Sequence, residues 1–251
     1  LKSSSYMKNF NSLFIVLTTS ILLLSGCTNN INRTSETSDP FENFNRKIFA
    51  FNKNIDEHVV EPISKKYVST IPATARESIN QHLYWMSLPQ TIINSAFQLE
   101  IENTILASAK FMLNSLTLGF YDLDDKQTTI NIKDFGSTLA KYNIPEGPFL
   151  MIPFLGPKNT RDFSGYIVDK QNIAKISPSK VDDVNLLEVP INIVTVREKL
   201  SGTLESVYNS SDPYIKMRSF YIQNRRATVY NNEYNKYKDK EKDQAFEQLL
   251  Q

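Results

Sequence analysis

Residues 101–121 read IENTILASAKFMLNSLTLGFY, and this stretch carries the strongest signal for the fold. After Ile105 its only charged residue is Lys110, and the part from Phe111 to Phe120 is apolar on nearly every helical face. A helix that is hydrophobic all round must be buried, either in protein or in lipid. The segment is shorter than the roughly 20 apolar residues that a membrane-spanning helix needs. A core helix of a soluble bundle and a helix lying partly in lipid therefore both remain open.

Helical signals also lie on both sides of this stretch. The run Asp39-Pro40-Phe41-Glu42 has the chemistry of a helix start, with Asp39 as the predicted N-cap and Pro40 at the first helical position. Glu61-Pro62 is expected to end or kink that helix, and Pro89 is expected to open a later one after a helix from Pro72 to about Trp85. The apolar residues that recur at helical spacing in the first helix are Phe44, Ile48, Phe51, Ile55 and Val59.

The amino-acid composition changes between Pro145 and Pro157, where four prolines and two glycines occur close together. Such a stretch cannot form a regular helix, and its large apolar residues argue against disorder. We expect a rigid non-helical loop here. Helical spacing resumes near Ile193, and Ser211-Asp212-Pro213 repeats the pattern of a cap followed by proline.

The composition agrees with a helical protein. Only 7 of 251 residues are glycine, and few runs alternate as strands do. The formal net charge of +1 gives no reason to expect nucleic acid as a partner. A single cysteine excludes an intramolecular disulfide and a thiolate metal cluster, and we expect neither a metal nor another cofactor.

The position of that cysteine predicts a lipid anchor. An apolar run over residues 13–24 has the length of a signal-peptide core, and Leu24, Ser25 and Gly26 followed by Cys27 resemble the bacterial lipobox. The resemblance implies removal of residues 1–26 and acylation of Cys27, while Met7 is a possible true start. Thr28, in place of aspartate, implies sorting to the outer membrane. The polar residues 27–38 are then predicted to form a flexible tether.

Four further blocks, in order along the chain, together resemble one family of outer-membrane lipoproteins, the MlaA (VacJ) family. The resemblance covers about residues 39–226. Within it, Ala140 and Asn143 depart from the family's glycine-rich spacing. Residues 231–251 form a short, highly charged tail, so partner contacts that relatives make in this region are not carried over to this chain. The blocks are DPFENFNRKIFAFN from Asp39, FMLNSLTLGFYD from Phe111, FGSTLAKYNIPEGPFLMIPFLGPKNTRD from Phe135 and SSDPYIKMRSFY from Ser210.

The resemblance implies a mainly α, ring-like single domain over residues 39–230, with a membrane-embedded helical hairpin and a Pro/Gly-rich loop. It implies a protein on the periplasmic face of the outer membrane, held there by its lipid. The implied role is to remove phospholipids misplaced in the outer leaflet through an amphipathic channel. The implied partners are outer-membrane phospholipids, trimeric porins and a periplasmic phospholipid carrier protein.

Two groups of residues are candidates for this role. We expect the first group to face acyl chains, with Gly119 at or near a hairpin turn. The second group is polar within apolar surroundings, and these side chains either fix the scaffold or meet a lipid headgroup. The first group is Leu113, Leu116, Leu118, Gly119 and Phe120, and the second is Asn45, Arg46, Asn52, Arg161 and Asp162.

Two other functions stay open at this point. A structural lipoprotein that binds porins without passing lipid would carry a similar sequence. A membrane phospholipase would need a positioned nucleophile or metal, but the sequence has neither HExxH nor GxSxG, and its two histidines are His58 and His82. We therefore do not expect an enzyme.

Overall fold

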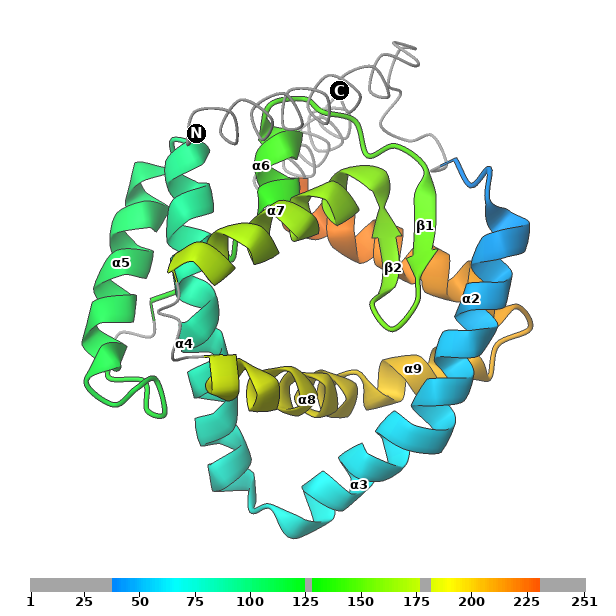
Figure 1. Cartoon of the computed structure of the whole chain (residues 1–251), viewed down its shortest axis with the longest axis horizontal. Helices are drawn as coiled ribbons and strands as arrows, with labels where there is room; N and C mark the ends of the chain where they lie inside the picture. The colour runs from blue at the N-terminus through cyan, green and yellow to red at the C-terminus, as the bar shows by residue number, and fades with distance from the viewer. Residues whose placement is uncertain (1–37, 125–127, 177–181, 231–251) are drawn as a thin grey trace, which may run out of the picture. The chain divides into compact units, whose positions relative to one another are not determined.

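The computed structural model describes residues 38–124, 128–176 and 182–230 (Figure 1). Contacts divide the chain into two units, residues 1–36 and 37–251, and the described residues belong to the second. The signal peptide, the lipobox, Cys27, the tether and the charged tail lie outside the described residues, so they stay predictions. The elements are α2 (Glu42–Ile55), η1 (Asp56–Val60), α3 (Glu61–Thr70), α4 (Ala73–Phe97), α5 (Ile101–Ser115), α6 (Phe135–Lys141), β1 (Phe149–Ile152), β2 (Gly156–Asn159), α7 (Thr160–Ile176), α8 (Asp182–Lys199), α9 (Ser201–Tyr208) and a helix over 213–230.

Within the second unit the helices follow one another around an open centre (Figure 1). The helix α7 and the two strands lie on one side of this centre, and α8 and α9 lie on the other. The helices α4 and α5 pack side by side as an antiparallel pair at one edge. The prediction of a mainly helical, ring-like domain that contains a helical hairpin is confirmed.

The first helix begins later than the sequence predicts. It starts at Glu42, its N-cap residue is Phe41, and no side chain caps it. Asp39 instead accepts a hydrogen bond from Asn45 Nδ2 at 2.8 Å and another from the hydroxyl of Tyr214. The predicted N-cap role of Asp39 is wrong because its carboxylate joins two distant helices instead.

Two prolines act differently from each other. Near Pro62 the regular helix is interrupted, because a π-helical turn, η1, separates α2 from α3. Pro89, however, lies inside the continuous helix α4 and does not open a new one. Proline removes one backbone hydrogen bond, and packing of α4 along α5 and against α6 and α8 outweighs that local cost.

The Pro/Gly-rich segment is non-helical, as predicted, but its centre is a β-hairpin. Strands β1 and β2 pair antiparallel, with Phe149 opposite Asn159 and Leu150 opposite Lys158. Because side chains alternate along a strand, Phe149 and Met151 share one face, and both are buried against Tyr214. The hairpin therefore belongs to the core that it forms with α2 and the helix 213–230.

A second, smaller core lies between α4 and α5. Leu88, Ala107 and Ile130 are buried there, with Trp85 and Phe111 packed against them. The rings of Trp85 and Phe111 stack with centroids 5.2 Å apart, and Trp85 Nε1 donates to the carbonyl of Phe111 at 3.0 Å. Among the described helices, none combines the length and the apolar character that a membrane crossing requires.

Candidate functional site

The polarity of the helical hairpin is inverted relative to that of an ordinary soluble protein. On α5 the side chains of Asn103, Lys110 and Asn114 are buried, whereas Met112 and Leu116 are 73% and 80% exposed. Soluble domains normally bury apolar side chains and expose charged ones. The inverted arrangement is typical of a helix whose outer face contacts an apolar environment.

The buried polar groups of α5 are satisfied by α4 and by the chain that follows α5. Asn103 donates to Ser95 Oγ at 2.7 Å and accepts from the backbone N–H of Asn131 at 3.0 Å. Lys110 Nζ lies 2.8 Å from Asp122, to which Asn114 Nδ2 also donates. Burial opposes the charge of Lys110, but the hydrogen bond to Asp122 and the nearby negative charges of Asp122 and Asp124 together raise the pKa of the lysine. Such partners make the inverted packing stable.

The hairpin residues singled out from the sequence are exposed, apart from one. Leu113, Leu116, Leu118 and Phe120 all present apolar surface. Gly119 is buried in the turn that follows α5, with φ of +75°, and an added Cβ would lie 2.4 Å from Trp85 Cβ. The turn that joins α4 to α5 lies instead at Leu99, whose φ is +58°. Gly119 therefore closes the hairpin's open end against α4.

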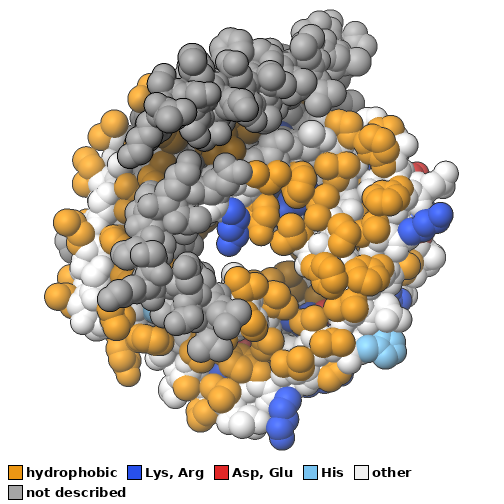
Figure 2. All heavy atoms as spheres, in the orientation of Figure 1, with side chains coloured by type: hydrophobic (Ala, Val, Ile, Leu, Met, Phe, Trp, Pro, Cys, Tyr) orange, Lys and Arg blue, Asp and Glu red, His pale blue; other side chains and the backbone are white. Residues whose placement is uncertain are grey.

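The inversion extends beyond the hairpin. On α2 the buried residues are Asn45 and Phe49, one position away from the predicted apolar stripe, so Phe44 and Phe51 remain exposed. Figure 2 shows apolar side chains across much of the visible face, with Lys and Arg side chains at the edge of a central hollow. Further exposed apolar residues on other helices are Ile63, Val68, Ile167, Val189, Ile193, Val196 and Ile215. The described part thus exposes many large apolar side chains outside the hairpin as well.

Three of the polar candidates hold α2 in place. Asn45 and Asn52 lie two helical turns apart, and their amides bond the backbone of β1 and of the residues after it. Asn45 accepts from Met151 N–H and donates to the Phe149 carbonyl, while Asn52 donates to the Ile152 carbonyl at 2.9 Å. These amides therefore act like a paired strand along the edge of the hairpin.

Arg46, the third of them, forms a bidentate contact. Its Nη1 and Nη2 donate to the two carboxylate oxygens of Asp212 at 3.1 and 2.8 Å, and its Nε donates to Glu42 at 2.8 Å. Asp212 also accepts from the backbone N–H of Ile215, which confirms the predicted helix start at Asp212-Pro213. Arg46 was expected either to fix the scaffold or to meet a lipid headgroup, and these contacts match the first role.

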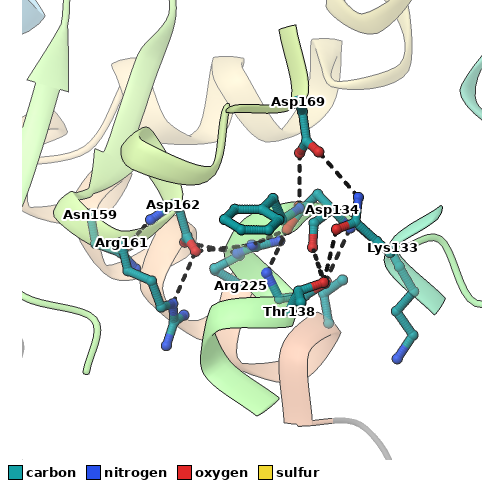
Figure 3. A network of polar contacts seen from close by, with 12 residues as sticks. Lys133, Asp134, Thr138, Asn159, Arg161, Asp162, Asp169 and Arg225 are labelled. Atoms are coloured by element: carbon teal, nitrogen blue, oxygen red, sulfur yellow. Dashed lines mark hydrogen bonds and ion pairs between the residues drawn. The ribbon is translucent and has the colours of Figure 1, made fainter. Parts of the chain in front are cut away.

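Asp162 belongs to a network centred on Arg225 (Figure 3). Arg225 donates two hydrogen bonds to Asp162 at 2.8 and 2.9 Å, and two to Asp134 at 2.8 Å each. Burial opposes the charge of Asp162, but the hydrogen bonds from Arg225 and Tyr221 and the charges of Arg225 and Arg161 together lower the pKa of the carboxyl. This cation joins the helix 213–230 to α7 and to the start of α6.

Arg161 is buried beside this network. Its Nη1 lies 3.3 Å from both the Ile144 carbonyl and the hydroxyl of Tyr230, and its Nε lies 3.3 Å from Asp162. These contacts are at the long end of hydrogen bonding. Arg161 therefore packs within the protein, and its contacts also match a role in fixing the scaffold.

A buried carboxylate, Asp169 on α7, joins the network to α4. It accepts from the backbone N–H of Phe135 at 2.9 Å and from the amides of Gln90 and Asn94 at 3.0 and 3.1 Å. Burial raises the pKa of Asp169. Figure 3 shows Asp169 and Asp162 on opposite sides of the start of α6, so polar contacts link several elements around the open centre.

Sequence reasoning missed the central cation, Arg225, and its partner Asp134. Asp134 could have been found from the sequence as a helix start, because it and Ser137 form the capping box that begins α6. No sequence pattern pointed to Arg225, since its partners lie 63 and 91 positions away along the chain. Arg197 was also missed; its Nε donates to both carboxylate oxygens of Asp56 at 2.8 and 2.9 Å.

The two histidines contact a backbone carbonyl and an aromatic ring, respectively. His58 is exposed and its Nδ1 lies 2.9 Å from the Asn54 carbonyl, while the His82 ring stacks on Phe120 at 4.5 Å. In the part of the chain that the structure describes, no cluster of three potential metal ligands occurs.

Comparison with known proteins gives consistent matches. A family model described as "MlaA lipoprotein" matches residues 37–228. An uncharacterized protein from Rickettsia typhi is 31% identical over 205 residues, which cover 80% of this chain and 81% of that protein. The intermembrane phospholipid transport system lipoprotein MlaA of Haemophilus influenzae is 27% identical over 218 residues, covering 84% and 87% of the two chains.

The three-dimensional comparison agrees. A structure reported as "Structural basis for maintenance of bacterial outer membrane lipid asymmetry" is 27% identical, with a TM-score of 0.66. The match covers 76% of this chain and 99% of that chain. From its sequence blocks, its helical ring and these matches, the chain belongs to the MlaA lipoprotein family.

Proposed function

We propose that this lipoprotein removes phospholipids from the outer leaflet of the outer membrane, and that it passes them to a periplasmic carrier for retrograde transport. One observation carries the proposal: buried positions are rich in polar groups, while many large apolar side chains are exposed. Relatives of this chain are named as lipoproteins of an intermembrane phospholipid transport system, which supports the same function.

The physical requirement for such a protein is modest. A charged headgroup crosses hydrocarbon at a high free-energy cost, so a polar path lowers the barrier without any bond being broken. The ring of helices has a central hollow with basic and apolar side chains at its edge (Figure 2). A headgroup would pass through this hollow while its acyl chains remain in apolar surroundings.

The apolar outer face explains how the domain would sit in the membrane. Leu113, Leu116, Leu118 and Phe120 would contact acyl chains of the inner leaflet. Cys27 would anchor the chain by its lipids after cleavage of residues 1–26, since more than one buried acyl chain holds a protein durably. The domain over residues 39–230 would therefore lie on the periplasmic side of the outer membrane, beside trimeric porins.

Transport of this kind needs no catalysis, and we propose that the protein is not an enzyme. The transport names of its relatives support this view. A phospholipase is tested directly by incubating the purified chain with phospholipid, because release of fatty acid would contradict our proposal. A scaffold that only binds porins is the other alternative, because an apolar face can also contact a protein.

The discriminating experiment is a deletion strain complemented with variants of α5. Met112→Asp with Leu116→Asp places two charges on the exposed face without disturbing buried groups. The matched control, Met112→Leu with Leu116→Met, keeps the same positions apolar. We expect deletion to raise outer-leaflet phospholipid, measured by surface labelling of aminophospholipid, and we expect only the control to restore the normal level.

Two results would contradict the proposal. Unchanged outer-leaflet phospholipid on deletion, together with disturbed porin complexes, would favour a scaffold. Full restoration by the aspartate variant would show that the apolar face of α5 is not needed in lipid.

A further inference from the structure

The π-helical turn η1, between α2 and α3, is held at both ends by one arginine. The backbone N–H of Glu61 donates to the carbonyl of Asp56, five residues back along the chain. Arg197, near the end of α8, contacts the side chains of both residues. Its Nε lies 2.8 and 2.9 Å from the two carboxylate oxygens of Asp56, and its Nη2 lies 3.2 Å from Glu61 Oε2. All three side chains are mostly buried.

This double contact fits a π turn better than an α-helical turn. In a regular α-helix each residue turns the chain by about 100°, so side chains five residues apart point about 140° away from each other. A π turn, whose hydrogen bonds join residues five apart, brings Asp56 and Glu61 onto one side. One guanidinium can then bind both carboxylates through charge-assisted contacts. Arg197 therefore stabilises the π form of this turn relative to the α form.

The residue after this pair favours the same turn. Pro62 lies in the first turn of α3. Proline has no N–H to donate to a regular helix, and its ring clashes with the carbonyl four residues back. A wider turn before Pro62 relieves that clash, so Arg197 and Pro62 act together on η1.

The π turn changes which side chains of α3 point outward. Counted at about 100° per residue from Phe44, Phe51 returns to the same face, but Ile63 in an uninterrupted α-helix would lie about 100° away from it. The π turn takes up one additional residue and so sets Ile63 back by about 100°, onto the face of Phe44 and Phe51. Phe44, Phe51, Val59 and Ile63 are all exposed, and we call these four residues the arc face.

Two lysines agree with this alignment. The same count places Lys47 of α2 and Lys66 of α3 on one flank of the arc face, each about 60° from it, and both are exposed. Lysines beside an apolar face can extend their ammonium groups to the boundary between lipid and water. Because α2 and α3 follow one another along one edge of the ring (Figure 1), the arc face forms a single apolar strip along that edge.

We propose that Arg197 is a positioning residue, which clamps η1 in the π form and so keeps the exposed apolar side chains of α2 and α3 in one strip that contacts the acyl chains of the membrane. The inference rests on the proposed function, which places the domain at the outer membrane. Without the clamp, η1 relaxes toward a regular α-helix. That change rotates α3 by about 100° relative to α2 and carries Ile63 out of the strip.

The test measures lipid contact at one position on each helix of the arc. The full chain is placed in vesicles of phosphatidylethanolamine and phosphatidylglycerol, with or without bromine on the acyl chains. Phe44→Trp and Ile63→Trp provide separate fluorescent reporters, which bromine quenches on contact. The signal of Trp85, the single natural tryptophan, is measured in the same vesicles and subtracted.

All variants carry Pro62→Ala, so that a regular α-helix is able to form. Arg197→Gln removes the clamp. The matched control is Lys199→Gln, a loss of the same charge at an exposed position of α8. The rescue variant combines Arg197→Gln with deletion of His58, an exposed residue of η1, because this deletion removes the additional residue of the π turn.

We expect bromine to quench both reporters in the Pro62→Ala protein and in the Lys199→Gln control. Arg197→Gln should lower the quenching at residue 63 about twofold or more, because of the rotation, and leave the quenching at residue 44 unchanged. Deletion of His58 should restore the quenching at residue 63, since a regular α-helix then presents the same face without a clamp. A residue that only stabilised local packing would not be rescued by a deletion. If Arg197→Gln prevents folding, the same deletion should restore the circular dichroism of the folded protein.

Unchanged quenching at residue 63 in the Arg197→Gln protein would overturn the positioning role. So would a His58 deletion that restores neither folding nor quenching. Quenching at residue 44 without quenching at residue 63 in the Pro62→Ala protein would overturn the alignment and leave the transport function standing. Absence of quenching at both positions would contradict the proposed place of the domain in the membrane.

Discussion

Replacing Arg225 by leucine would remove the cation that joins the helix 213–230 to α6 and α7. The guanidinium donates four hydrogen bonds, and of its two partners Asp162 is almost fully buried, with 4% of its side chain exposed. Removing one partner of a buried pair costs about 3–5 kcal/mol because a charge is left without compensation. Asp162 keeps its bond from the Tyr221 hydroxyl at 2.7 Å, so the lower end of that range applies.

The second carboxylate adds less. Asp134 has 36% of its side chain exposed, so water screens it and its share is about 1 kcal/mol or less. We therefore expect Arg225→Leu to lower the free energy of unfolding by roughly 3–4 kcal/mol. The matched control is Arg226→Leu on the same helix, whose ion pair with Glu146 is more exposed than the Arg225–Asp162 pair, with 31% and 16% of the two side chains exposed against 15% and 4%, so we expect a smaller cost.

The pH dependence gives the same reasoning an independent check. In the natural protein the pKa values of Asp134 and Asp162 lie below their usual values, despite burial, because Arg225 bonds the charged forms. Their stabilising contribution is therefore complete above the ordinary carboxyl pKa of about 3.9 and is lost as the pH falls through the lower folded values. Without Arg225, burial raises the folded pKa of Asp162, so acidification from neutral pH should stabilise the variant.

Both effects are measured by urea unfolding of the purified chain in detergent, followed by circular dichroism at several pH values. The double variant Arg225→Leu with Asp162→Asn should recover part of the lost stability, because the buried charge has gone. A cost for Arg225→Leu no larger than that for Arg226→Leu would refute the reasoning. So would an unchanged pH dependence.

Three further predictions follow from local geometry. Gly119→Ala should lower the free energy of unfolding by about 2 kcal/mol or more in thermal unfolding, because φ is positive there and the added Cβ would also clash with Trp85. Gly156→Ala is the control: its φ is +77° but the space around it is open, so it should cost about 1 kcal/mol, and equal costs for the two variants would contradict the clash. Asn45→Ala should cost about 2–3 kcal/mol by the same assay, since it leaves the Phe149 carbonyl and the Met151 N–H without the Asn45 amide, and a cost under 1 kcal/mol would show that water replaces it. Leu116→Lys should leave stability in detergent unchanged but weaken flotation with phospholipid vesicles, and undiminished flotation would place this face outside lipid.

The sequence by itself determined the helical class, the non-helical character of the Pro/Gly-rich segment and membership of the family. These features depend on local chemistry, such as the proline at residue 213 behind Asp212, whose carboxylate caps the following helix as predicted. The apolar residues of segment 101–121 likewise predicted that it would not be an ordinary amphipathic helix. The identity of these elements is set mostly by neighbours along the chain.

Only the tertiary structure decided which face of each helix points outward. Apolar periodicity marks a stripe but does not say what covers it, and on α2 the buried face is centred one residue away from that stripe, on Asn45 and Phe49. The same holds for Arg225, Asp134 and Asp162, whose contacts join residues far apart in sequence, and for Pro89, which tertiary packing retains inside α4. The free energy of burying a group depends on its partners in space, and folding alone brings those partners together.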